Sequence, residues 1–382
     1  MNEFDYINHK IQDIIGNAGN LRLFHNDYRF DKDLDIIKEV YFGPGINNQV
    51  EKKDACVTRR RVKLKQLVSF PKDIPCLVYY INHSYEPVHA HLDRDFFNTI
   101  VDHNRVNFPF TIYILHSEKD SQDIQYLQAQ TGLELIHWFA NGYLCAEHWY
   151  RLYKDVNVVT EYKPLQHKFI CANRLIDDKR SYRIKFLNML DVSQGQYSLL
   201  EQDPNTLRTP SEIYPDNQVE PHSFDEHNNS SAWINLRIYD DDKKEFTPSV
   251  WKSSFLHVVP ETVVDRVHLT EKIFKPIVLK QPFVLLNGAG GLEYLRSYGF
   301  KTFSDFWSEE YDTIDNLDQR LQAVADIVNN VGSCSLSELT QMRDKMKPIL
   351  EHNYNWFYNG FADKCWSELE TNMQTVFDNP AS

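Results

Sequence analysis

The sequence predicts an α/β protein made of two halves, each with alternating strands and helices, followed by long C-terminal helices. Three observations support this prediction. Short apolar runs alternate with helix-like stretches before residues 162–167 and again after them, and the last part of the chain carries apolar residues at helical spacing. We therefore predict domains at 1–165 and 166–335, and helices at 336–382 that can return to the first domain.

In the first half, apolar runs of strand length occupy residues 76–81, 111–115 and 134–138. Helix-like stretches lie between them at 92–101 and 124–130. Short apolar strands that alternate with helices are typical of βαβ units, so a parallel sheet is expected.

In the second half, residues 203–230 interrupt the alternating pattern with four prolines among polar residues. We interpret this segment as a long surface loop that can move over a site. The elements expected around it are strands at 168–172, 232–238, 255–259 and 282–286 and a helix at 181–190.

The C-terminal helices show clear local signals. Leu317, Leu321, Val324, Ile327 and Val331 form one apolar stripe. The segment Ser335–Glu338 has the pattern of a capping box, which predicts the start of the next helix. Within that helix, Pro348 predicts a kink.

The composition is that of a globular protein, with 42% hydrophobic and 25% charged residues among 382. The formal net charge of -13 argues against a surface that coats nucleic acid as a whole. No apolar run reaches the length of a membrane span and no secretory signal is visible, so a cytoplasmic location is expected. The six cysteines form no CxxC pair, which favours reduced thiols over a structural zinc site.

The most informative segment follows the apolar run at 255–259. Glu261 is expected at the end of a strand, Thr270 as the N-cap of a helix, and Glu271 and Lys272 in its first turn. Ligands of parallel sheets bind at the carboxyl ends of strands, where a Glu can accept from a ribose hydroxyl and a Lys can neutralise a diphosphate. The alternative is a Glu that only complements the helix dipole, with a solvated Lys.

A glycine-rich turn comes next, between a predicted strand and a predicted helix that ends at Gly299. The N–H groups around Gly288, Gly290 and Gly291 are expected to be free to cradle a phosphate or a sugar hydroxyl. The turn matches neither GxGxxG nor a P-loop, and an ordinary tight turn is an equal alternative.

Several segments of this part of the sequence resemble a known class of enzymes. The segments 269–276, 282–283, 290–303 and 310–312 resemble the donor-binding half of putative phage and bacterial glycosyltransferases. They are more distantly similar to the C-terminal domain of the α1,3-fucosyltransferases. The resemblance covers roughly residues 168–320. It implies a GT-B-like fold, in which two Rossmann-like domains face each other across a cleft, and a nucleotide-sugar donor linked to UDP, GDP or CMP.

The resemblance also implies roles for single residues. Glu271 would hold the nucleotide ribose, Lys272 the phosphates, and an arginine of the first βα unit, Arg174 or Arg180, the diphosphate. The segment has Thr270 where the family usually has Ser, which keeps a hydroxyl at that position. The alternative for either arginine is a surface ion pair with a neighbouring aspartate.

An inverting enzyme of this class needs a base near the acceptor hydroxyl, usually from the N-terminal domain. The candidates here are His83, Glu86, Asp93 and Asp95, and the sequence does not choose among them.

No metal is expected at this site. The pair Asp240 and Asp242 has the DxD spacing that can hold a divalent cation, but a charged turn or solvated loop is the favoured interpretation. The histidines at 83, 89 and 91 lack a completing zinc ligand and are interpreted as lining a cleft.

The acceptor is expected to be a saccharide. The basic stretch 52–65, with Arg59, Arg60 and Arg61, is interpreted as a solvated strand or helix edge or as a patch for an anionic glycan or lipid surface. It also supports an alternative in which the enzyme binds a phosphate backbone and glycosylates a modified base in phage DNA. A further alternative is a carbohydrate-related binding protein that keeps the fold without turnover.

Overall fold

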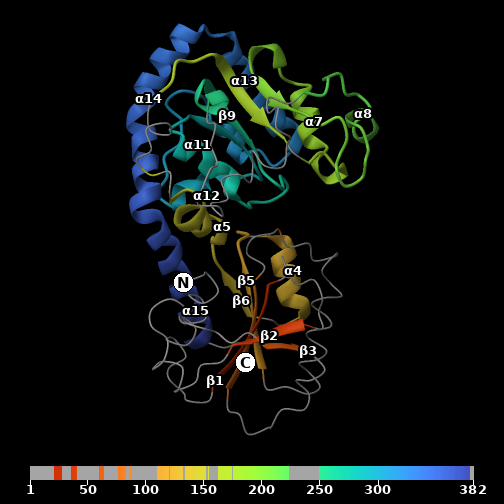
Figure 1. The fold of residues 1–382 in the computed structure, drawn as a ribbon, viewed down its shortest axis with the longest axis vertical. Helices are drawn as coiled ribbons and strands as arrows, with labels where there is room; N and C mark the ends of the chain where they lie inside the picture. Colours follow the sequence, from red (N-terminus) through yellow and green to blue (C-terminus); the bar gives the residue numbers. More distant parts are fainter. Residues whose placement is uncertain are drawn as a thin grey trace. The chain divides into compact units, whose positions relative to one another are not determined.

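The computed structural model describes residues 21–27, 36–40, 60–63, 76–82, 87, 110–119, 121–131, 134–151, 154, 162–173, 175–222 and 249–378. The chain divides into two compact units. One contains residues 1–140 together with 365–382, and the other contains residues 141–364. Both are α/β units, and the chain ends in long helices, which is compatible with a Rossmann-like fold (Figure 1).

The first unit is built on a six-stranded sheet with the strand order β3-β2-β1-β4-β5-β6. Strands β1, β4, β5 and β6 run parallel, as predicted, while β2 runs antiparallel to β1 and β3 antiparallel to β2. The elements are β1 (Leu21–Asp27), β2 (Ile36–Val40), β3 (Arg60–Lys63), β4 (Cys76–Asn82), β5 (Phe110–His116), α4 (Gln122–Thr131) and β6 (Glu134–His137).

The second unit has a four-stranded, fully parallel sheet with the order β10-β9-β7-β8. Its strands are β7 (His167–Ala172), β8 (Gln196–Ser198), β9 (Ser254–Pro260) and β10 (Phe283–Leu286). Every residue of β9 and β10 is buried. Strands that are buried along their whole length are expected where both faces of a parallel sheet are covered.

The helices around this sheet include α7 (Tyr182–Leu187), α11 (Phe274–Val278), α12 (Gly291–Ser297), α13 (Leu317–Ser333) and α14 (Leu336–Trp356). Helix α13 packs on β7, β9 and β10, and α14 packs on β7, β9 and α11. Shorter elements are α5 (Ala140–Leu144), η1 (Cys145–Trp149), η3 (Asp178–Arg180), η4 (Val192–Gln194), α8 (Pro210–Ile213), α10 (Ser249–Lys252), η5 (Glu271–Ile273), η6 (Glu310–Thr313) and η7 (Phe357–Phe361).

Two of the local signals in the C-terminal half, the capping box at Ser335 and the helix end at Gly299, match the structure. The Ser335 hydroxyl accepts from the Glu338 N–H and the Glu338 carboxylate reaches back, which completes the predicted capping box of α14. Gly299 has φ +96°, so it ends α12 in the left-handed conformation that glycine adopts without strain. Helix α14 continues through Pro348 as one helix.

The division between the units falls at residues 140 and 141 rather than near 165. The physical reason is an aromatic contact inside the second unit. Tyr150 packs edge-on against Phe357 at 6.0 Å, and the Tyr358 hydroxyl donates to the Tyr150 carbonyl at 2.9 Å. Residues just after 140 are therefore held to η7, which no local sequence pattern indicates.

The last helix, α15 (Ala362–Asp378), belongs mostly to the first unit. Trp366 packs edge-on against Trp138 at 6.1 Å. The Asn372 amide donates to the His137 carbonyl at 2.9 Å, and Glu368 accepts from the Phe139 N–H at 3.3 Å. Helix α15 is thus fixed to the end of β6.

The described part of the segment predicted as a mobile surface loop, residues 203–222, contains buried polar contacts and a short helix, while residues 223–230 lie outside the described residues. Asp203 is fully buried, and its carboxylate accepts from the N–H groups of Ile176, Asn205 and Thr206. These bonds lower the pKa of Asp203 although its burial acts to raise it. The segment also contains helix α8 with its own capping box. The predicted elements at 92–101 and 232–238 lie outside the described residues.

Candidate functional site

The strand order of the second sheet indicates where a ligand is expected. After β7 the chain adds β8 on one side and then crosses to add β9 on the other. The carboxyl ends of β7 and β9 therefore flank the point where the winding direction changes, which is where open parallel sheets bind ligands. Glu261 follows β9 directly, and its N–H donates to the Leu286 carbonyl at 3.0 Å, which extends the pairing with β10.

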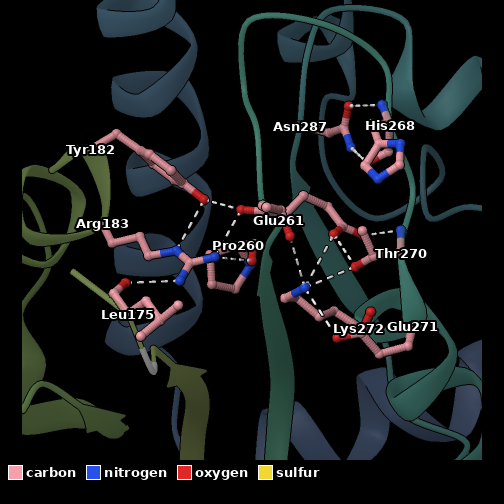
Figure 2. A network of polar contacts seen from close by, with 11 residues as sticks. Leu175, Tyr182, Arg183, Pro260, Glu261, His268, Thr270, Glu271, Lys272 and Asn287 are labelled. Carbon is pink, nitrogen blue, oxygen red and sulfur yellow. Dashed lines mark hydrogen bonds and ion pairs between the residues drawn. The ribbon is translucent and has the colours of Figure 1, made fainter. Parts of the chain in front are cut away.

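Glu261 is fully buried, and Figure 2 shows it at the centre of a polar network. Its carboxylate accepts from the Thr270 N–H at 3.0 Å and from the Thr270 hydroxyl. Thr270 is the N-cap residue of η5, as predicted, but its side chain makes no capping hydrogen bond there. Its hydroxyl is instead committed to Glu261. Burial raises the pKa of Glu261, and the nearby Lys272 and the Thr270 bonds only partly offset this.

Lys272 reaches from η5 towards Glu261 and Thr270 (Figure 2). Its ammonium donates to the Thr270 hydroxyl at 2.9 Å, to the Thr262 hydroxyl at 3.1 Å and to Glu271 Oε1 at 3.2 Å. The Glu261 carboxylate lies at 3.9 Å. The Lys272 side chain is 19% exposed, so an anion from solvent can reach it.

Glu271 is the second carboxylate beside Lys272, and its side chain is one-third exposed. Burial acts to raise its pKa, but the Lys272 ammonium and hydrogen bonds outweigh burial and lower it. Glu271 is therefore ionised at neutral pH and can accept from a hydroxyl. The structure thus brings Glu261, Thr270, Glu271 and Lys272 together at the carboxyl end of β9.

Arg183 is a site residue that the sequence reasoning did not select. Its buried guanidinium donates to the Leu175 carbonyl at 2.9 Å, to Pro260 at 3.3 Å and to Glu261 at 3.0 Å. The Tyr182 hydroxyl also donates to the Glu261 carbonyl. These contacts join the segment after β7 to the end of β9 (Figure 2). The basic stretch after β7 indicated that an arginine lies at this edge of the sheet, but the local sequence does not show which arginine points inward.

We expect Arg183→Ala to lower the free energy of unfolding by about 3 kcal/mol, because buried carbonyl oxygens lose their donors. Arg180→Ala is the matched control. The Arg180 guanidinium pairs with Asp177 three residues earlier, and both side chains are partly exposed, so about 0.5 kcal/mol is expected. Urea unfolding measures both changes. Equal losses would show that Arg183 does not hold the two strand ends.

The pairing of Arg180 with Asp177 matches the alternative role considered for it in the sequence. Asp178, the other neighbouring acid, binds Arg208 through both oxygens at 2.7 Å. Arg174 lies outside the described residues. Lys272 is a described cation at this edge of the sheet whose side chain is partly exposed and lies beside the carboxylates of Glu261 and Glu271.

The glycine turn does not present the free N–H groups that the sequence predicted. Gly288 donates to the Arg266 carbonyl and to the Asn287 side chain, Gly290 to the Asp312 carbonyl, and Gly291 to the Gly288 carbonyl. The turn is also fastened to the loop before η5, because the Asn287 amide donates to the His268 carbonyl at 2.9 Å (Figure 2). A phosphate-binding role for Gly288, Gly290 and Gly291 gains no support from these contacts.

Asp312 occupies the N-terminus of α12. Its carboxylate accepts from the Leu292 N–H at 2.8 Å and from the Glu293 N–H at 3.0 Å. Asp312 lies far along the chain from the turn, so no local cap signal exists for it. The nearly buried carboxylate supplies the negative charge that the helix N-terminus attracts.

We expect Asp312→Ala to destabilise the protein by about 2 kcal/mol, because two amide groups at the start of α12 lose a charged acceptor. Asp312→Asn keeps one acceptor oxygen, so about half of that loss is expected. Thermal unfolding compares the two variants with the parent. A larger loss in the Asn variant than in the Ala variant would contradict the capping role.

The second unit also contains a cavity of about 480 Å³ beside η6 and α13. Phe306, Trp307 and Met342 are among its lining residues. Its lining in the described part of the chain includes Glu310 and Asp326 but neither Lys nor Arg. Acidic groups without a cation do not suit a diphosphate, so this cavity is not the candidate donor site.

The candidate bases His83, Glu86, Asp93 and Asp95 lie outside the described residues, as do Asp240, Asp242, His89 and His91. Within the part of the chain that the structure describes, no group of three His, Cys, Asp or Glu side chains could hold a metal ion.

Of the predicted acceptor-binding arginines, Arg60 and Arg61 belong to β3 at the edge of the first sheet. Their register partners in β2 are Glu39 and Lys38. Arg59 lies outside the described residues. None of the helices in the described ranges is long and apolar enough to cross a membrane.

Fold and site together define an α/β protein with a Rossmann-like parallel sheet and a Glu–Thr–Glu–Lys cluster at its carboxyl edge. No family model matches the chain, and no curated protein matches its sequence. Among solved structures, a chain of the GtfA/B complex is similar at a TM-score of 0.34 with 9% identity. The match covers 88% of this chain and 65% of that chain. A likeness this small carries no functional argument, so function is inferred from the site.

Proposed function

We propose that this protein is a glycosyltransferase that transfers a sugar from a nucleotide-sugar donor to a hydroxyl acceptor. The observation that carries the proposal is the position of Lys272. Its partly exposed ammonium lies at the carboxyl end of β9, beside the crossing point of a parallel sheet, with the ionised Glu271 next to it. An ammonium suits a diphosphate, and a carboxylate suits a ribose hydroxyl.

The proposed sugar transfer follows from a donor whose diphosphate contacts Lys272 and whose ribose contacts Glu271. The acceptor hydroxyl attacks the anomeric carbon of the sugar, the bond from that carbon to the phosphate oxygen breaks, and the nucleotide leaves (a nucleoside diphosphate from a UDP- or GDP-sugar, CMP from a CMP-sugar). Negative charge builds up on the leaving oxygen in the transition state, where the Lys272 ammonium stabilises it. The hydroxyl proton passes to a base, for which His83, Glu86, Asp93 and Asp95 stay the candidates.

The acceptor proposed here is a saccharide hydroxyl. A modified DNA base is the alternative, based on the basic stretch that includes Arg59, Arg60 and Arg61. A protein that binds nucleotide sugars without turnover is the second alternative. Triple replacement of these arginines by alanine distinguishes a saccharide acceptor from a DNA acceptor. If the arginines bind the DNA backbone, the variant loses DNA affinity and the salt dependence of binding.

A thermal-shift panel of UDP-glucose, GDP-mannose and CMP-sialic acid tests the proposal. A ligand that binds only the native state raises the unfolding temperature with the logarithm of its concentration over its dissociation constant. We expect at least one of the three to do so in the parent protein. Transfer or hydrolysis of that donor above background would exclude the non-catalytic alternative. No shift with any nucleotide sugar would overturn the donor assignment.

A further inference from the structure

Glu261 is fully buried, so it is not placed to touch a donor directly. Glu261 is instead linked through Thr270 to Lys272, whose side chain is partly exposed. The Thr270 hydroxyl donates to its carboxylate and in turn accepts from the Lys272 ammonium at 2.9 Å. This chain of contacts runs from a buried carboxylate to a cation that solvent can reach (Figure 2).

Resting on the proposed function, we propose that Glu261 is a positioning residue for Lys272, and that it takes up a proton when the anionic donor binds there. An ammonium has three hydrogens, and Lys272 already uses them on Thr262, Thr270 and Glu271. A phosphate oxygen that binds Lys272 must therefore displace or share one of these partners.

Binding of a diphosphate at Lys272 changes the electrostatic environment of the Glu261 carboxylate. Its ionised form is favoured by Lys272 at 3.9 Å and opposed by burial. A diphosphate at Lys272 shares that positive charge and adds negative potential nearby. Both effects disfavour the buried carboxylate, and protonation removes the repulsion. The protonated acid keeps an oxygen for the Thr270 N–H, so the turn stays in place.

The other charged groups around Glu261 do not replace it in this role. Glu271 is one-third exposed and its pKa is lowered, so it stays ionised. Arg183 and Tyr182 contact the Glu261 carbonyl rather than its carboxylate. Burial raises the pKa of Tyr182, which keeps that phenol neutral. Of the described acidic groups compared here, Glu261 is therefore the one positioned to gain a proton.

Calorimetric titration of an intact nucleotide sugar tests this inference. The esterified phosphate groups of such a donor do not themselves titrate near neutral pH, so proton exchange reports on the protein. Titrations in PIPES and in imidazole, which differ in ionisation enthalpy, measure the number of protons bound. We expect uptake of up to about one proton per donor, and an affinity that rises by up to about tenfold for each unit of falling pH.

Two variants identify the group. Glu261→Gln imitates the protonated acid without a charge, and we expect it to bind the donor with no proton uptake and a flat pH profile. Glu271→Gln is the matched control, in which weaker binding with unchanged proton uptake is expected. The pH dependence of the parent protein tests the coupling even if Glu261→Gln fails to fold.

The outcomes separate this inference from the proposed function. Donor binding with uptake that Glu261→Gln abolishes supports both. Donor binding without proton uptake, or with uptake unchanged in Glu261→Gln, overturns the role of Glu261 and leaves the glycosyltransferase proposal in place. Absence of binding by every nucleotide sugar overturns the donor site and the coupling together.

Discussion

Replacing Lys272 by methionine is expected to weaken nucleotide-sugar binding by about 100-fold, because a charge-assisted contact to phosphate is worth up to about 3 kcal/mol. Methionine retains most of the apolar volume of the lysine stem while it removes the ammonium. The fold is expected to persist, since the buried Glu261 can protonate when its counter-ion is gone. Calorimetric titration measures the affinity, and thermal unfolding verifies the fold.

Lys347→Met is the matched control for Lys272→Met. Lys347 is about half exposed and pairs with Asp344 at 2.9 Å, so its loss removes the same formal charge at a surface position. We expect its nucleotide affinity to equal that of the parent protein. If both variants lose affinity equally, the effect comes from overall charge, and Lys272 is not the phosphate contact.

Gly288→Ala is expected to destabilise the protein as strongly as Arg183→Ala. A Cβ atom at this position would lie 2.2 Å from the Arg266 carbonyl carbon and 2.4 Å from its oxygen. These are main-chain atoms, so the loop before η5 must move to relieve the clash. We expect a loss of about 3 kcal/mol in the free energy of unfolding, measured by urea denaturation.

Gly290→Ala serves as the comparison for Gly288→Ala. Its Cβ would meet only Val267 at 3.7 Å, which is ordinary contact, but the residue has φ +85°. The left-handed conformation costs an alanine about 1 kcal/mol. A greater loss for Gly290→Ala than for Gly288→Ala would contradict the close packing of the two loops.

The part of the site around η5 could be predicted because its residues lie close together in sequence. A strand end at Glu261 and a helix start at Glu271 and Lys272 follow from local patterns, and a parallel sheet then places them at its ligand-binding edge. The glycine turn shows the limit of this reasoning. Its N–H groups look free in the sequence, yet Gly290 donates to the Asp312 carbonyl, Gly288 to the Arg266 carbonyl and Gly291 to the Gly288 carbonyl.

The choice between the arginines shows the same limit. Arg180 and Arg183 lie in one short basic stretch and have the same chemistry. Arg180 faces Asp177 near the surface, whereas Arg183 is buried against the end of β9. Only the tertiary contacts of Arg183 with Pro260 and Glu261 distinguish the buried arginine from the one in a surface ion pair.

The sequence by itself determined the α/β pattern, the capping box at Ser335 and the left-handed Gly299, because each depends on neighbours within a few residues. The tertiary structure decided the partners of Thr270 and Asp312 and the division after residue 140. The physical reason is that a buried polar group must find a partner wherever packing brings one, and that partner can lie anywhere in the chain.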